Sequence, residues 1–73
     1  MDIIVGQKYI GRQDATLGTL IRVVEVDENE SQAVFITLTS SSLWSIDYTG
    51  RLSIGAIEHY FKPLKIIIKQ LEV

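Results

Sequence analysis

Apolar and polar residues alternate through the middle of this chain, and a period of two residues predicts β-strands rather than helices. The alternation runs through residues 33–39, 44–48 and 51–54. In the first stretch we expect Val34, Ile36 and Leu38 to face a core, which sends Phe35 to the opposite face of the strand. Antiparallel strands that pack one face on a core and turn the other toward water have this pattern.

Turn-forming residues divide the strands into hairpins. The charged segment 27–31 predicts a hairpin between strands at 20–26 and 33–39. Thr49-Gly50 predicts a second hairpin, because glycine adopts the positive φ that a tight turn requires. A short first strand is expected at 6–11.

One stretch, residues 55–61, has helical spacing. Ile57, Tyr60 and Phe61 lie at positions i, i+3 and i+4 and would share one face of a helix. Gly55 is the expected N-cap and Pro63 is expected to end the helix. A last strand is then expected at 64–71.

The chain has 73 residues and no cysteine. This length predicts one domain over residues 1–73, and the absence of cysteine excludes disulfides and thiolate metal sites. No stretch approaches the ~20 apolar residues of a membrane-spanning helix, and the N-terminus lacks the features of a signal peptide. We therefore expect a cytoplasmic protein without membrane association.

The predicted layout resembles an SH3-like small barrel. The resemblance rests on Val5-Gly6-Gln7-Lys8-Tyr9, on Arg22–Asp27 with its acidic hairpin, and on Ile57–Pro63. It implies a mainly β fold, an antiparallel barrel of five to six strands with one short helical turn near the C-terminus. The layout also resembles short proteins encoded by bacteria, phages and mobile elements. Residues 12–18 lack the acidic and aromatic cluster with which signalling SH3 domains bind proline-rich peptides, so that ligand is not expected.

Catalysis has little support in this sequence. His59 is the one histidine, and no nucleophile motif accompanies it, so we expect it on the solvent side of the helix. The carboxylates of segment 27–31 lack the spacing and central glycine of a calcium loop. The glycines are dispersed and build no phosphate-binding loop. We expect a protein that is not an enzyme and has no metal or cofactor.

Aromatic and apolar side chains are the better candidates for a binding surface. Phe35 is expected to face outward and Tyr60 to lie on the short helix. The segment Lys65–Val73 carries Ile66 and Ile68 on one face and Ile67, Leu71 and Val73 on the other. A barrel buries one face of a closing strand, so the second face predicts a homodimer through this segment or another protein partner. The predicted partner-binding residues are Phe35, Tyr60, Ile67 and Leu71.

Basic residues suggest an alternative partner. Lys62, Lys65 and Lys69 follow one another near the C-terminus, and Arg51 is expected to lie beside them; such a stripe next to aromatic residues can bind a nucleic-acid backbone. The formal net charge is −2, which argues against general DNA binding. We therefore expect a module that binds another protein, such as a phage or mobile-element inhibitor of a host or defence enzyme in the host cytoplasm. The alternative is a nucleic-acid-binding accessory domain.

Overall fold

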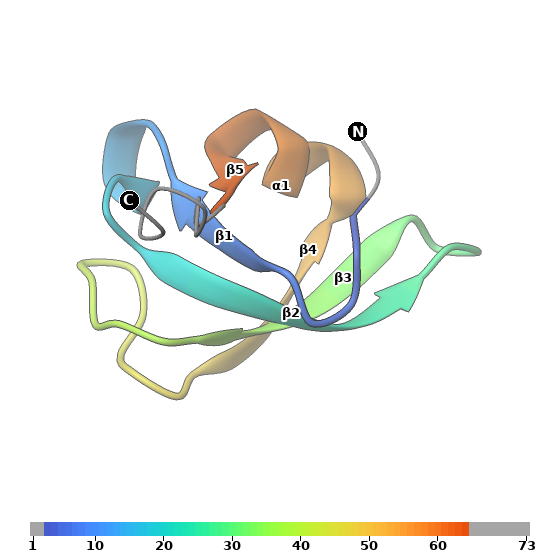
Figure 1. Ribbon diagram of the computed structural model, residues 1–73, viewed down its shortest axis with the longest axis horizontal. Coiled ribbons are helices and arrows are strands. Elements are labelled where there is room, and N and C mark those ends of the chain that lie inside the picture. The colour runs from blue at the N-terminus through green and yellow to red at the C-terminus, as the bar shows by residue number, and fades with distance from the viewer. Residues whose placement is uncertain (1–2, 65–73) are drawn as a thin grey trace, which may run out of the picture.

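Five antiparallel strands form one open sheet in the computed structural model, which describes residues 3–64 of the chain (Figure 1). The sheet order is β4-β3-β2-β1-β5, so β4 and β5 are its two edges. The prediction of a mainly β, antiparallel fold with one short helix near the C-terminus is confirmed. The elements in chain order are β1 (Lys8–Gly11), the 3-10 helix η1 (Asp14–Thr16), β2 (Leu20–Asp27), β3 (Gln32–Thr37), β4 (Thr49–Ser53), α1 (Ile54–Tyr60) and β5 (Phe61–Pro63).

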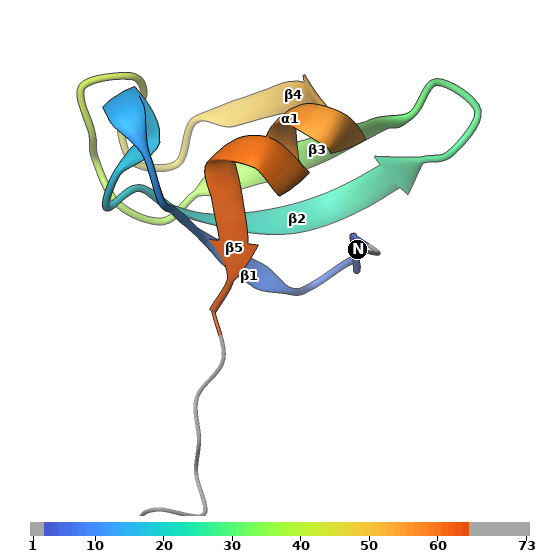
Figure 2. The same cartoon turned by 90° about the horizontal axis from the view of Figure 1, so that it is seen from above.

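The second strand bends in its middle and curls the sheet. Residues 20–22 of β2 pair with β1, and residues 21–27 pair with β3 on the other side, with a shift of register between Val23 and Glu25. The extra residue, Val24, makes a β-bulge, which increases the local twist of a strand. The curled sheet leaves room for α1 on one of its sides, between β4 and β5 (Figure 2).

The core lies between the curled sheet and α1. Ile57 of the helix is fully buried against residues from β1, β2, β3 and β5. Partly buried side chains of Ile3, Val26, Trp44 and Leu52 pack around this cluster. The buried hydrophobic residues are Tyr9, Ile21, Val23, Ala33, Phe35, Ile57 and Phe61.

The predicted phase of β3 is wrong. Phe35 is 1% exposed and faces the core, while Val34 and Ile36 lie half-buried on the other face. Both faces of β3 carry apolar side chains, so the alternation alone could not show which face packs on the core. Phe35 pairs with Gly50 of β4, which has no side chain, and this vacancy gives the larger residue its room in the core.

The second predicted hairpin is also wrong. Residues 44–48 belong to the loop between β3 and β4, and Thr49-Gly50 begins β4 instead of forming a turn. The first hairpin, over the charged segment 27–31, is confirmed by the pairing of Asp27 with Gln32.

The helix spans Ile54–Tyr60 instead of 55–61, and its N-cap lies two residues earlier than predicted. Ser53, and not Gly55, is the N-cap, and its side chain accepts a hydrogen bond from the backbone N–H of Ala56. The helix ends at Tyr60, and Pro63 lies in β5, where it pairs with Tyr9. This position suits proline because β5 is an edge strand. The predicted last strand at 64–71 falls, except for Leu64, outside the described residues, and so does the predicted dimer segment Lys65–Val73.

Within residues 3–64, no helix has the length and apolar character needed to cross a membrane.

Candidate protein-binding groove

An apolar groove lies between η1, α1 and the β3–β4 loop, next to Leu52 of β4. Its volume is about 280 Å³. Residues from η1, the β3–β4 loop, β4, α1 and β5 line it, and none carries a carboxylate, an imidazole or an amine. We call this site the aromatic groove; its lining residues are Ala15, Thr16, Leu43, Trp44, Leu52, Ala56, Tyr60 and Phe61.

The wall of the groove formed by Leu43 and Trp44 is held by a hydrogen-bonded loop. Ser41 Oγ accepts from the backbone N–H groups of both residues, at 3.2 Å each, and the N–H of Ser41 donates to the carbonyl of Trp44. The buried Thr37 fixes the other end of the loop. Its Oγ1 donates to the carbonyl of Ser45 at 2.6 Å and accepts from the N–H of Tyr48 at 2.8 Å.

Aromatic packing holds the indole of Trp44 at the groove. Its ring is nearly parallel to those of Tyr48 and Phe61, with centroids 6.0 Å and 6.5 Å away. Phe35 lies against it at 4.9 Å with a tilt of 53°. Trp44 is thus anchored on one side by the core, and it remains half-buried because its other side lines the groove.

The opposite wall depends on the C-terminal end of α1, where backbone carbonyls lack partners within the helix. Side chains of the segment after β1 satisfy them. Arg12 donates to the carbonyls of Glu58 and His59, at 2.9 Å and 3.1 Å, and Gln13 donates to that of His59 at 2.7 Å. The cation of Arg12 also suits the negative end of a helix. These bonds fix the position of Tyr60 at the groove.

The lining of the aromatic groove is suited to binding apolar side chains of a partner, and it offers little for catalysing a reaction. General acid–base catalysis needs a titratable group positioned at the reacting atom, and the lining offers only the phenol of Tyr60. The volume is slightly below the ~300–1,000 Å³ that small-molecule sites usually have. Leu43 and Tyr60 are 45% and 37% exposed, so the rim presents apolar surface to a partner.

The predicted partner-binding residues are separated by the structure. Tyr60 lines the groove, whereas Phe35 is buried in the core against Trp44, so its predicted outward orientation is wrong. Ile67 and Leu71 lie outside the described residues.

The predicted basic stripe is divided as well. Arg51 lies on β4 and Lys62 on β5, which are opposite edge strands of the sheet, and both side chains are exposed. Lys65 and Lys69 lie outside the described residues. His59 is exposed, as expected, and its ring packs edge-on against Tyr60 at a centroid distance of 4.6 Å.

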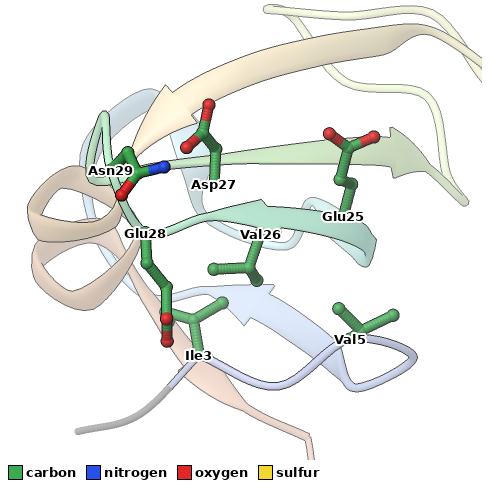
Figure 3. Close-up of a pocket in the computed structure, with 7 residues that line it drawn as sticks. All are labelled: Ile3, Val5, Glu25, Val26, Asp27, Glu28 and Asn29. Carbon is green, nitrogen blue, oxygen red and sulfur yellow. The ribbon is translucent and has the colours of Figure 1, made fainter.

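A second and larger cavity, of about 590 Å³, lies at the acidic hairpin (Figure 3). Ile3, Val5 and Val26 form its apolar part. In Figure 3 the carboxylates of Glu25 and Asp27 point to one side of β2, and the side chain of Glu28 extends toward Ile3 instead. In the part of the chain that the structure describes, no three acidic or histidine side chains are grouped to hold a metal ion.

Of the residues that line the groove, sequence reasoning named Tyr60 alone as partner-binding, and it missed Arg12 and Ser41 as the residues that position the walls. Ser41 had a usable signal, since serine before a loop residue often bonds to nearby backbone N–H groups. Arg12 had none, because its partners follow it by 46 and 47 residues. No family model, curated protein or solved structure matches this chain.

Proposed function

We propose that this chain is a non-enzymatic interaction module that binds another protein through the aromatic groove. The observation that carries the proposal is an apolar groove built around one half-buried tryptophan and held by hydrogen bonds on both walls. Pre-formed pockets with aromatic anchors are where binding energy concentrates in protein interfaces. A rigid wall also loses less conformational entropy when the partner binds.

We also assign the strand order to an SH3-like barrel. Two features support this assignment. The bent β2 pairs with β1 in its first half and with β3 along its length, so it belongs to both halves of the curled sheet. The helix α1 joins the two edge strands and packs Ile57 into the core between them. The resemblance to phage-encoded proteins adds one class of partner to test, a host or defence enzyme.

The proposal is tested by affinity capture from an extract of the source cells, using matched surface variants. Leu43→Asp places a charge at the exposed rim of the groove, and Leu17→Asp places the same charge at a residue that is 69% exposed and does not line the groove. A partner retained by the wild type and by Leu17→Asp, and lost with Leu43→Asp, supports the proposal. Equal retention by all three proteins contradicts a role for the groove.

A further inference from the structure

The outer edge of β4 presents unpaired backbone groups beside the aromatic groove. The N–H of Thr37 donates to the carbonyl of Tyr48, and the N–H of Ile54 donates to the carbonyl of Ser31. In an antiparallel ladder every second residue directs its N–H and C=O toward the neighbouring strand. Residues 50 and 52, which lie between these two bonds in the same phase, therefore bond to β3. Thr49 and Arg51 direct their backbone groups away from the sheet.

Nothing among the described residues covers this edge. Both Thr49 and Arg51 are exposed, and no hydrogen bond from residues 3–64 reaches their outward backbone groups. Figure 2 shows β4 at the border of the molecule, with no described element beyond it. An open edge of this kind is a template for pairing with another chain.

We propose that the partner of this module binds as an extended segment, antiparallel to β4, as a sixth strand of the sheet. This inference rests on the proposed function, because the added strand occupies the rim of the aromatic groove. Peptides that extend an existing sheet gain affinity from backbone hydrogen bonds and specificity from pockets for alternate side chains.

The residues of β4 define the side chains of the partner. Partner residues opposite Gly50 and Leu52 share the core-side face, since directly opposite residues point the same way. The rings of Tyr48 and Phe35 fill the space over Gly50; Phe35 is buried, but Tyr48 is 43% exposed, and Leu52 lines the groove. Both positions therefore select apolar partner residues.

The partner residue opposite Arg51 lies on the face of the sheet away from the core, and the charge of Arg51 favours an acidic residue there. Nη1 of Arg51 donates to Oε1 of Gln32 at 3.3 Å, which is a neutral acceptor, and no carboxylate among residues 3–64 neutralises its charge. The same charge disfavours a second copy of this chain. Two antiparallel β4 strands centred on Arg51 would place this residue opposite its own counterpart, and like charges directly opposite each other are destabilising.

The test uses capped heptapeptides in which apolar and polar residues alternate, with glutamate at the central polar position. Binding is followed by the fluorescence of Trp44, the one tryptophan of the chain, and by hydrogen exchange of single backbone amides. We expect binding to slow exchange at Thr49 and Arg51. N-methylation of the peptide should weaken binding about tenfold per site at the polar positions, whose N–H groups bond to β4, and little at the apolar positions.

Charge reversal provides the matched control. Arg51→Glu should reject the glutamate peptide and bind the corresponding lysine peptide, with the wild type showing the opposite preference. Arg51 is exposed, so the fold should persist, and amide spectra of the free variant verify it.

Three outcomes separate the inference from the proposed function. Selective protection of Thr49 and Arg51 together with the alternating effect of N-methylation supports strand addition. Peptides that change Trp44 fluorescence but leave both amides unprotected overturn strand addition and leave the groove as a binding site. If no peptide of alternating or scrambled order binds, both the inference and the binding of peptide segments at the groove are overturned.

Discussion

Thr19 and Thr37 are both fully buried threonines, and their hydroxyl groups have opposite surroundings. Thr37 Oγ1 bonds to two backbone groups of the β3–β4 loop. Thr19 Oγ1 has no hydrogen-bond partner within the described part of the chain. A buried polar atom without a partner keeps its full cost of desolvation, whereas a bonded one offsets that cost.

Replacing each threonine with valine should therefore change stability in opposite directions. Thr19→Val removes an unpaired hydroxyl and should raise the free energy of unfolding by about 1 kcal/mol. Thr37→Val leaves the N–H of Tyr48 and the carbonyl of Ser45 without that partner and should lower it by about 2 kcal/mol. Chemical denaturation of the two variants and the wild type measures both changes. Destabilisation by Thr19→Val would mean that its hydroxyl has a partner in solution.

Gly50 and Gly55 form a second matched pair at the scale of single residues. A methyl group on Gly50 would lie 2.6 Å from the ring of Tyr48 and 2.8 Å from that of Phe35, whereas one on Gly55 meets no atom within 4 Å. Gly50→Ala should lower the free energy of unfolding by about 1–3 kcal/mol. It should also shift the fluorescence of Trp44, which packs on both rings. Gly55→Ala, in the helix, should stabilise the fold by about 0.5–1 kcal/mol. Thermal unfolding monitored by fluorescence compares them, and a neutral Gly50→Ala would contradict the aromatic packing.

At the scale of elements, α1 has seven residues and is too short to be stable by itself. Ser53 caps its first turn, Arg12 and Gln13 bond to its last carbonyls, and Ile57 anchors it in the core. The helix therefore depends on the segment after β1 as much as on its own sequence.

Arg12→Ala should loosen the C-terminal turn of α1. Two carbonyls lose a charged donor, and we expect a loss of about 1–2 kcal/mol in the free energy of unfolding. Faster amide exchange should appear in α1 and at Phe61, whose N–H bonds to the carbonyl of Ile57. The control is Arg22→Ala on β2, an exposed residue whose side chain makes no hydrogen bond within residues 3–64. Equal effects of the two substitutions would contradict the capping role of Arg12.

The sequence was informative where local chemistry decides the structure. The charged hairpin and the short helix follow from turn residues and from helical spacing over a few positions. The assignment of 44–48 as a strand failed because Trp44 and Tyr48 pack on the core from a loop, and their spacing imitates a strand. The phase of β3 failed because its two faces are equally apolar, and the pairing of Phe35 with Gly50 decides it. That pairing is a tertiary contact.

The candidate site was predictable only in part for the same reason. Tyr60 was singled out as an aromatic residue on the predicted short helix. The groove is formed by residues from five separate segments of the chain, and a local sequence pattern does not predict contacts between such distant segments.

At the scale of the whole molecule, the charge of the protein favours a protein partner over a nucleic acid. The formal net charge is −2. Arg51 and Lys62 lie on opposite edges of the sheet, and Arg12 is engaged with the carbonyls of α1. The other two described cations, Lys8 and Arg22, face each other across β1 and β2, so two neighbouring cations are the largest basic group that the strand pairing brings together. Affinity for nucleic acid of arbitrary sequence comes mainly from cations that neutralise phosphates.

We therefore expect negligible binding to duplex DNA of arbitrary sequence at about 150 mM salt, where charges more than ~8 Å apart are largely screened. Fluorescence anisotropy with a labelled duplex measures this, and a titration at low salt serves as the control for weak electrostatic contact. Submicromolar binding that weakens steeply with salt would favour the nucleic-acid alternative. In that case Lys62→Ala and Arg51→Ala, compared singly, would identify which edge of the sheet makes the contact, because each substitution on a phosphate-binding edge reduces the salt dependence.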